Sequence, residues 1–185
     1  MVTKGLDFDH VSLVGIINAD QLIHHPGYRS HERAFQLMMQ VAGRAGRKHK
    51  KGRVMIQTSD PGHPVIQNVL NSDFKKMYET EILSRRQFQY PPFNRMIEIT
   101  LKHKEVQMIE QAALYLANEL RKTNTAKVLG PVIPYVSKIN NYYIRQILLK
   151  SSLQGQMKSA LQTVLDKMKT VQGLKNVDVK IDVDP

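Results

Sequence analysis

The stretch "YPPFNRMIEITLK", Tyr90 to Lys102, divides the chain into two parts and decides the fold of the second. Its two prolines cannot continue the helical pattern that precedes them, and each restricts the residue before it to extended backbone. Directly afterwards, "RMIEITLK" alternates apolar and polar residues, as a strand with one buried face does. The sequence therefore predicts one domain at 1–89, a linker at 90–94 and a second domain at 95–185.

Downstream of this boundary the elements alternate in a recognisable order. A helical pattern at 105–122 follows the first strand, and the extended stretch "AKVLGPVIPYV" and the strand "YYIRQILLK" come next. "LQGQMKSALQTVLDKMKTV" is a second helical pattern, and "NVDVKIDVD" alternates to the end. The order βαββαβ is that of the ferredoxin-like α+β fold, so we predict this fold for the second domain.

Upstream of the boundary, the pattern predicts a parallel sheet. "HVSLVGIIN" (10–18) is a β-branched, almost continuous apolar run, which favours a strand buried on both faces, and we expect a polar loop at 19–29. A helix is predicted after Ser30, a plausible N-cap, with Glu32 in its first turn and Phe35 and Met38 on its apolar face. "RVMIQT" (53–58) reads as the next strand. Strand, helix and strand form a parallel crossover, followed by two more helical patterns before the prolines.

The composition indicates a polyanionic partner. The chain has 27 Lys and Arg against 16 Asp and Glu, a formal charge of +11. A protein this basic favours nucleic acid, because each neutralised phosphate releases counterions. There are no cysteines, no secretory pattern and no apolar run long enough for a membrane span, so the cytoplasm is expected. The histidines at 24, 25, 31 and 49 fit no common ligand spacing, and no metal site is predicted.

The stretch "QVAGRAGRKHKKGR" (40–53) concentrates the basic residues. On a helix, Arg44 and Arg47 would project from one face, with Gln40 on the same side. Gly43 and Gly46 each cost roughly 1 kcal/mol relative to alanine in a helix interior. That cost is reasonable if a ligand must approach the backbone closely, so the two guanidiniums could grip a polyphosphate. A basic helix face with incidental glycines explains the pattern equally well.

Several motifs carry a resemblance to a known family. "QVAGRAGR" resembles motif VI of superfamily 2 helicases, Q-x-x-G-R-x-G-R, and "TKGLDF" (3–8) resembles motif V. Together with "YPPF", "LGPVIP", "YYIRQILLK" and the closing "IDVDP", in that order, the chain is similar throughout to the primosomal replication-restart helicases. The resemblance implies an α/β protein: the C-terminal part of a RecA-like helicase lobe with a parallel sheet, followed by the ferredoxin-like domain.

The resemblance also implies roles for residues. Arg44 and Arg47 would be arginine fingers that reach a triphosphate bound by the first lobe, a contact worth about 10³–10⁵ in rate. Gln40 would contact the γ-phosphate or the attacking water. The remaining implied positions are Gly5, Asp7 and Gly43 near the nucleotide, with Asp7 at the ribose, and Thr3 and Lys4 at the DNA backbone.

Other parts of the motor are absent from this sequence. No G-x-x-x-x-G-K-[ST] loop is present to cradle phosphates, and no D-E-x-H box is present to hold Mg²⁺. The family's cysteine-rich zinc insertion is absent too. We therefore expect a C-terminal portion of a larger helicase, with Met1 internal to the parent, that cannot hydrolyse ATP alone. ATP, Mg²⁺ and zinc would be bound by the parent.

Two further stretches are candidates for DNA contact. The block at Lys48, Lys50 and Lys51 is either a solvated loop or a phosphate-binding one. "SKINNYYIRQILLK" (137–150) interleaves cations with tyrosines: Lys138, Tyr143, Arg145 and Lys150. Alternation places Tyr143 and Arg145 on one face, which could stack bases and bind phosphates if it is exposed. The alternative is that one tyrosine packs in the core.

Two functions follow from these patterns. The first is part of an ATP-dependent 3′-to-5′ DNA helicase in the bacterial cytoplasm, which restarts replication at stalled or branched forks by primosome assembly. The resemblance implies forked or branched DNA, single-strand/double-strand junctions, other primosome proteins and single-strand-binding protein as partners, and no membrane. The second is a non-catalytic basic nucleic-acid-binding module; a ribosome-associated structural protein is a weaker third.

Overall fold

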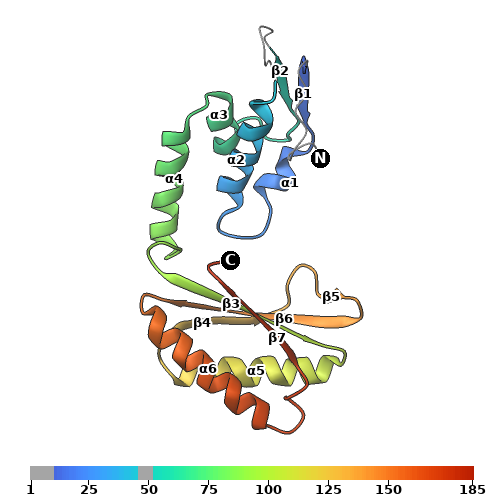
Figure 1. Cartoon of the computed structure of the whole chain (residues 1–185), viewed down its shortest axis with the longest axis vertical. Coiled ribbons are helices and arrows are strands. Elements are labelled where there is room, and N and C mark those ends of the chain that lie inside the picture. Colours follow the sequence, from blue (N-terminus) through green and yellow to red (C-terminus); the bar gives the residue numbers. More distant parts are fainter. Residues whose placement is uncertain (1–10, 46–51) are drawn as a thin grey trace. The chain divides into compact units, whose positions relative to one another are not determined.

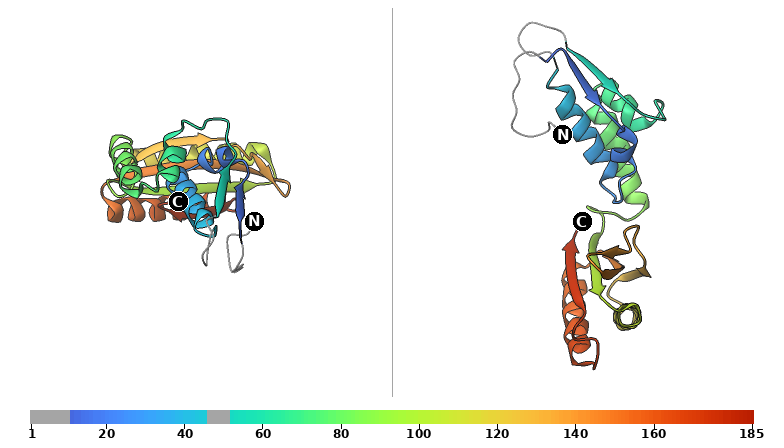
Figure 2. Two further views of the ribbon diagram at one scale, coloured as in Figure 1. Left: turned by 90° about the horizontal axis from the view of Figure 1, so that it is seen from above. Right: turned by 90° about the vertical axis from the view of Figure 1, so that its right-hand side faces the viewer.

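A computed structural model describes residues 11–45 and 52–185 of the chain (Figures 1 and 2). The chain divides into two compact units, Met1–Arg86 and Gln87–Pro185. Each unit has its own hydrophobic core.

The described residues of the N-terminal unit form two strands and four helices in the order β1, α1, α2, β2, α3 and α4. Their bounds are Leu13–Ile16, Ala19–Ile23, Ser30–Ala42, Arg53–Ile56, Pro64–Leu70 and Phe74–Gln87. β1 and β2 pair in parallel, with Leu13 opposite Arg53 and Ile16 opposite Ile56. The predicted strand, helix and strand are therefore confirmed as a parallel pair whose connection contains α2. The predicted loop at 19–29 is wrong in its first part, because α1 begins directly after Asn18.

The core of this unit lies between α2 and its neighbours. Phe35 and Met38 of α2 are buried in one cluster with Ile16 of β1 and Ile66 of α3. Ser30 is the first residue of α2 and does not cap it through its side chain; Arg29 occupies the cap position.

The two strands are more exposed than their sequence predicts. In β1, Leu13 is 55% exposed and only Ile16 is buried; in β2, Met55 is 63% exposed. The prediction of a strand buried on both faces is therefore wrong for this chain. In the part of the chain that the structure describes, the sheet consists of β1 and β2 alone.

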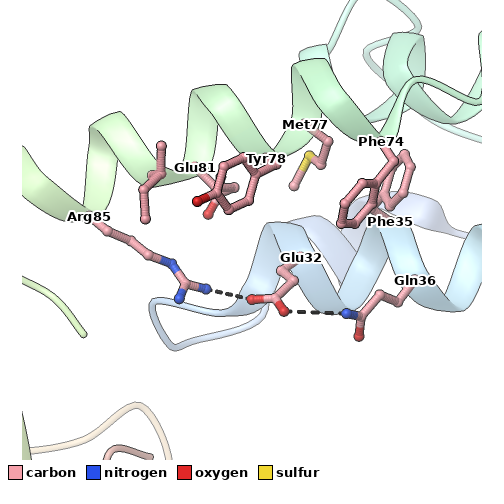
Figure 3. Close-up of a pocket in the computed structure, with 9 residues that line it drawn as sticks. Glu32, Phe35, Gln36, Phe74, Met77, Tyr78, Glu81 and Arg85 are labelled. Atoms are coloured by element: carbon pink, nitrogen blue, oxygen red, sulfur yellow. Dashed lines mark hydrogen bonds and ion pairs between the residues drawn. The ribbon is translucent and has the colours of Figure 1, made fainter. Parts of the chain in front are cut away.

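Helix α4 is fixed to α2 by polar and aromatic contacts (Figure 3). Arg85 donates to Glu32 at 2.5 Å, and the rings of Phe35 and Phe74 lie 6.3 Å apart. These side chains border a small cavity of about 140 Å³ between the two helices. At the start of α3, the His63 ring accepts a hydrogen bond from the Val65 amide and caps the helix.

The C-terminal unit contains five strands and two helices in the order β3, α5, β4, β5, β6, α6 and β7. Their bounds are Arg95–His103, Val106–Lys122, Lys127–Val132, Lys138–Ile139, Tyr142–Ser151, Gln154–Thr170 and Asp178–Val183. The sheet order is β4-β6-β3-β7, and every pairing is antiparallel. Apart from the two-residue β5, this is the predicted βαββαβ plan, with the first and third long strands at the centre of the sheet.

Both helices pack on the same face of this sheet, and the other face carries no helix (Figure 1). Ile97, Ile99 and Leu101 alternate along β3 and are buried beneath α5 and α6 together with Ile147 of β6. Gly130 in β4 has a φ of +97°, and a Cβ there would lie 2.8 Å from the Gln146 carbonyl oxygen. This position therefore requires glycine. No helix within the described residues is long and apolar enough to cross a bilayer.

Candidate functional site

The arginine motif begins where helix α2 ends. The helix stops at Ala42, and the amides of Arg44 and Ala45 bond back three residues, to Val41 and Ala42, instead of four. Arg44 therefore lies in a turn after the helix, and the prediction that it belongs to a continuing helix is wrong. Glycine has low helix propensity, which accounts for an end directly before Gly43.

Among the described residues of this unit, no close contact requires glycine at position 43. Its φ is −66°, which any residue adopts, and a Cβ there would meet only the carbonyl oxygens of Met39 and Gln40 at 3.5 and 3.6 Å. These are ordinary contacts. The bare backbone at Gly43 is therefore open toward the exterior of the chain.

Gln40 lies on the exposed side of α2. It lines a shallow depression with Arg33, Gln36 and Leu37, which follow the helical spacing of one face. The opposite face of the helix carries the buried Phe35 and Met38. This side of α2 thus presents amide and guanidinium groups next to the turn that contains Arg44.

A second polar cluster joins the carboxyl ends of β1 and β2. The Asp20 carboxylate accepts hydrogen bonds from the Thr58 hydroxyl at 2.5 Å and the Ser59 amide at 2.9 Å. These bonds stabilise the ionised form and lower the pKa of Asp20 to about 2. Our sequence interpretation missed this cluster, although carboxyl ends of parallel strands commonly carry functional polar groups. Here the carboxylate ties the two loops together.

Two histidines of this unit, His31 and His63, lie close together at the surface of α2 and α3. His31 pairs with Glu81 at 3.1 Å, and the hydrogen bond to that carboxylate raises the pKa of His31. The His63 ring lies 5.4 Å from the His31 ring, and burial lowers its pKa. Within the described ranges, no group of His, Asp or Glu side chains could hold a metal ion.

In the C-terminal unit, the predicted basic face of β6 faces the core. Arg145 is only 5% exposed, and its guanidinium bonds to the Glu110 carboxylate and to the Ile144 carbonyl. Tyr143 packs against the same core as Ile147. Helix α5 therefore covers the face of β6 that carries Arg145, and this face is not exposed to DNA. The hydrogen bond from Arg145 lowers the pKa of Glu110.

Lys150 is also buried. Its ammonium donates to the Phe88 carbonyl at 3.1 Å and lies 3.8 Å from the centroid of the Tyr90 ring. Burial lowers the pKa of Lys150. The DNA-binding prediction for Lys150 is therefore wrong: the side chain anchors the "YPPF" segment to the end of β6.

Lys138 remains accessible. It lies in β5, where its ammonium is 4.7 Å from the centroid of the Tyr143 ring, a cation–π contact. The other predicted site residues lie outside the described ranges: Thr3, Lys4, Gly5, Asp7, Arg47, Lys48, Lys50 and Lys51. Their assignments stay predictions.

The fold and these sites define a mixed α/β protein in which a parallel strand pair and an arginine-bearing turn precede a ferredoxin-like antiparallel unit. Residues 86–185 match the family described as "Primosomal protein N C-terminal domain", which covers the second of the two units. The chain belongs to this family.

Similar proteins extend the match to the whole chain. It is 37% identical to the replication restart protein PriA of Bacillus subtilis and to that of Treponema pallidum. It is 36% identical to the PriA of Synechocystis. Each match covers 100% of this chain but only 23%, 28% and 22% of the respective relative. The chain therefore spans about a quarter of the length of these curated relatives.

Proposed function

We propose that this chain is the C-terminal portion of an ATP-dependent 3′-to-5′ DNA helicase that recognises stalled or branched forks and restarts replication by primosome assembly. The observation that carries the proposal is the motif VI pattern Gln40-x-x-Gly43-Arg44 at the exposed end of α2, in a chain similar throughout to replication restart proteins. In this proposal the protein acts in the bacterial cytoplasm.

The motif residues would complete a nucleotide site whose other half lies on another lobe. Arg44 and Arg47 would stabilise negative charge on the transferring γ-phosphoryl group, and Gln40 would orient the attacking water. The open backbone at Gly43 supports a close approach from outside the unit. Gly5 and Asp7 would border the nucleotide.

Metal chemistry would come from other parts of the parent protein. Magnesium would accompany ATP, and zinc would occupy the family's cysteine-rich insertion.

The exposed strands support the view that the N-terminal unit is the end of a RecA-like lobe. Parallel sheets are almost always covered on both faces, whereas Leu13 and Met55 are more than half exposed here. Further helices packed on the open faces of a larger sheet would bury these apolar side chains. Full burial of a Leu or Met side chain contributes roughly 1.5–3 kcal/mol, so covering the exposed part of Leu13 or Met55 contributes about half of that.

DNA would be held by charge without sequence preference. Lys48, Lys50, Lys51 and Lys138, with Thr3 and Lys4, would contact the phosphate backbone of forked DNA. Other primosome proteins and single-strand-binding protein are the expected protein partners.

The test joins this chain to a first lobe that supplies the phosphate-binding loop. Arg47→Lys in the joined protein is expected to abolish most DNA-stimulated ATP hydrolysis, because lysine cannot reproduce the forked contact of arginine. DNA affinity should stay unchanged. Lys75→Arg, which keeps the charge at a highly exposed position of α4, is the control and should leave both properties intact.

Two outcomes would contradict the proposal. If Arg47→Lys weakens DNA binding but leaves hydrolysis unchanged, the chain is the alternative non-catalytic nucleic-acid-binding module. If the purified 185-residue chain hydrolyses ATP by itself when DNA is added, the expectation that it needs another lobe is wrong.

A further inference from the structure

Strand β7 leaves one edge of the antiparallel sheet open. Among the described strands it is the last in the order β4-β6-β3-β7, and it pairs only with β3. Two of its apolar side chains are also partly uncovered: Ile181 is 42% exposed and Val183 is 41% exposed, although Ile99, opposite Ile181 on β3, is buried. An open strand edge is a template on which another strand can pair.

The backbone of β7 directs every second amide and carbonyl outward. The Asp184 amide donates to the Met96 carbonyl at 2.9 Å, so this residue forms a hydrogen-bonded pair with β3. In an antiparallel ladder such pairs alternate, so the even-numbered residues of β7 bond to β3. The odd-numbered residues, Val179, Ile181 and Val183, therefore point their amides and carbonyls away from the sheet.

The side chains of β7 alternate between apolar and charged. The odd-numbered residues are valine and isoleucine, and Val179 packs against the core on the helix side of the sheet. The even-numbered residues on the opposite face are Asp178, Lys180 and Asp182, and all three are exposed. A strand that presents one lysine between two aspartates can match the charges of a copy of itself.

One register of two antiparallel copies satisfies both the hydrogen bonds and the charges. With Ile181 of the two copies opposite each other, Lys180 lies opposite Asp182 on both sides of the two-fold axis, and Val179 lies opposite Val183. The outward amides and carbonyls at these odd-numbered positions then face each other, as a ladder requires.

Other registers fail on one of these criteria. A shift by one residue places the outward groups of one copy opposite residues that bond to β3, so no ladder forms. A shift by two residues brings Lys180 opposite Lys180 or Asp182 opposite Asp182, and like charges directly opposite each other destabilise a sheet. Larger shifts leave at least half of the strand unpaired.

The residues at the two ends of this pairing do not oppose it. Asp178 would lie opposite Asp184 of the second copy, but Asp184 has a φ of 52° and turns out of the strand. The Asp184 carboxylate is also held within its own chain, where it accepts from Arg95 at 2.6 Å and from the Met96 amide at 2.9 Å. The negative charge near Asp178 is therefore already balanced by a guanidinium.

We propose that this chain binds a second copy of itself through β7, so that the two antiparallel sheets join edge to edge across a two-fold axis. Opposite charges and β-branched side chains that face each other across strands stabilise a sheet, and the two-fold axis repeats the pair of Lys180 and Asp182. A contact of this kind closes on itself, so the assembly stops at two copies. The strand has six residues, so the interface is small and the dimer is expected at micromolar rather than nanomolar concentration.

The test measures the mass of the 185-residue chain by sedimentation equilibrium over a concentration series at low salt. The unchanged chain should pass from monomer to dimer. Lys180→Asp and Asp182→Lys each place like charges opposite each other at two positions, and each should weaken the dimer at least about 2- to 30-fold, the loss of two cross-strand charge pairs. Lys127→Asp is the matched control, because it makes the same charge change at an exposed position of β4, the other edge of the sheet. It should leave the dimer unchanged.

A mixture of the two weakened variants separates a contact between copies from a structural effect. In a mixed dimer the carboxylate introduced at position 180 of one chain faces the ammonium introduced at position 182 of the other, and the remaining Asp182 faces the remaining Lys180. An equimolar mixture of Lys180→Asp and Asp182→Lys should therefore form dimers near the concentration that the unchanged chain requires. Mixing does not reverse damage to the fold of one copy, and circular dichroism verifies that each variant is folded.

Three results would overturn the inference: a monomer at every concentration up to the millimolar range, a dimer that Lys180→Asp does not weaken, or a mixture that stays monomeric. The first would leave the edge of β7 to another segment of a longer protein. The second would place the contact on another surface, such as the exposed strands β1 and β2. None of these measurements involves ATP hydrolysis or the arginine motif, so a failure here is distinguishable from a failure of the proposed function.

Discussion

Replacing Arg145 with alanine tests whether this arginine is part of the core or part of a DNA-binding face. The guanidinium is buried and donates through Nε to Glu110 at 2.9 Å and through Nη1 to the Ile144 carbonyl at 2.7 Å. If the structure is right, Arg145→Ala lowers the free energy of unfolding, and any loss of DNA binding follows only from unfolding.

The magnitude follows from these contacts. A hydrogen bond to a charged group contributes about 1.5–3 kcal/mol. The Glu110 side chain is 42% exposed, so water replaces part of the lost interaction and the lower end of that range applies. The loss of the bond to Ile144 and of packing by the arginine stem adds about 1 kcal/mol. We therefore expect Arg145→Ala to lower the free energy of unfolding by about 2–3 kcal/mol.

The assay is urea unfolding of the full chain, followed by far-ultraviolet circular dichroism. Glu110→Gln is the matched control and should cost less than 1 kcal/mol, because an exposed amide still accepts a hydrogen bond from Arg145. Arg145 keeps the pKa of Glu110 below its usual 4.5, so this stabilisation is present above that pH and is lost as the pH falls. The difference between Arg145→Ala and the unchanged chain should therefore shrink in acid. Equal stability of the two proteins at neutral pH, with weaker DNA binding by the variant, would refute the reasoning.

Three further changes test the described contacts. Asp20→Asn should destabilise the N-terminal unit at neutral pH, as measured by urea unfolding. The difference in stability between the two proteins should vanish as the pH falls from 3.8 toward 2, since the folded pKa of Asp20 is about 2. Thr58→Val should reproduce part of the loss. Glu81→Gln should lower the pKa of His31 in an NMR titration, because the hydrogen bond to Glu81 raises that pKa. The His31–Glu81 pair stabilises the protein below pH 6.5, and this stabilisation is lost as the pH rises through the raised pKa of His31. Gly130→Ala should cost about 1–3 kcal/mol in urea unfolding, because alanine is strained at a φ of +97°. An unchanged urea midpoint for Asp20→Asn or Gly130→Ala, or an unchanged pKa of His31 in Glu81→Gln, would contradict the contact concerned.

The ferredoxin-like unit was predictable because its information is local. Alternation along 95–102 and the helical spacing at 105–122 each appear within one element, and the structure confirms both elements. The two-residue β5 was not predictable in this way, since Lys138 and Ile139 are too few to show a period. Its signal was the Asn140-Asn141 turn, which the positive φ values explain.

The site in the C-terminal unit was only half predictable. Alternation along β6 separates Tyr143 and Arg145 from Tyr142, but it does not say which face the helices cover. Because Arg145 is charged, we expected its side chain to face solvent. In the structure Glu110 on α5 forms an ion pair with Arg145, which makes its burial tolerable. That partner is 35 residues away in sequence, so no local pattern reveals it.

The prediction that failed for β1 also carries information. Its apolar pattern is that of a strand covered on both faces, and the chain leaves Leu13 exposed. Exposed Leu and Met side chains on a two-stranded parallel sheet do not stabilise an isolated unit, because a sheet of two strands is only marginally stable without further packing. The pattern is explained if helices of a larger lobe cover these faces, as in the proposed RecA-like lobe. We therefore expect Leu13→Ser to destabilise the joined helicase by more than it destabilises this chain. Equal losses in the two proteins would mean that nothing covers β1 in the larger protein either.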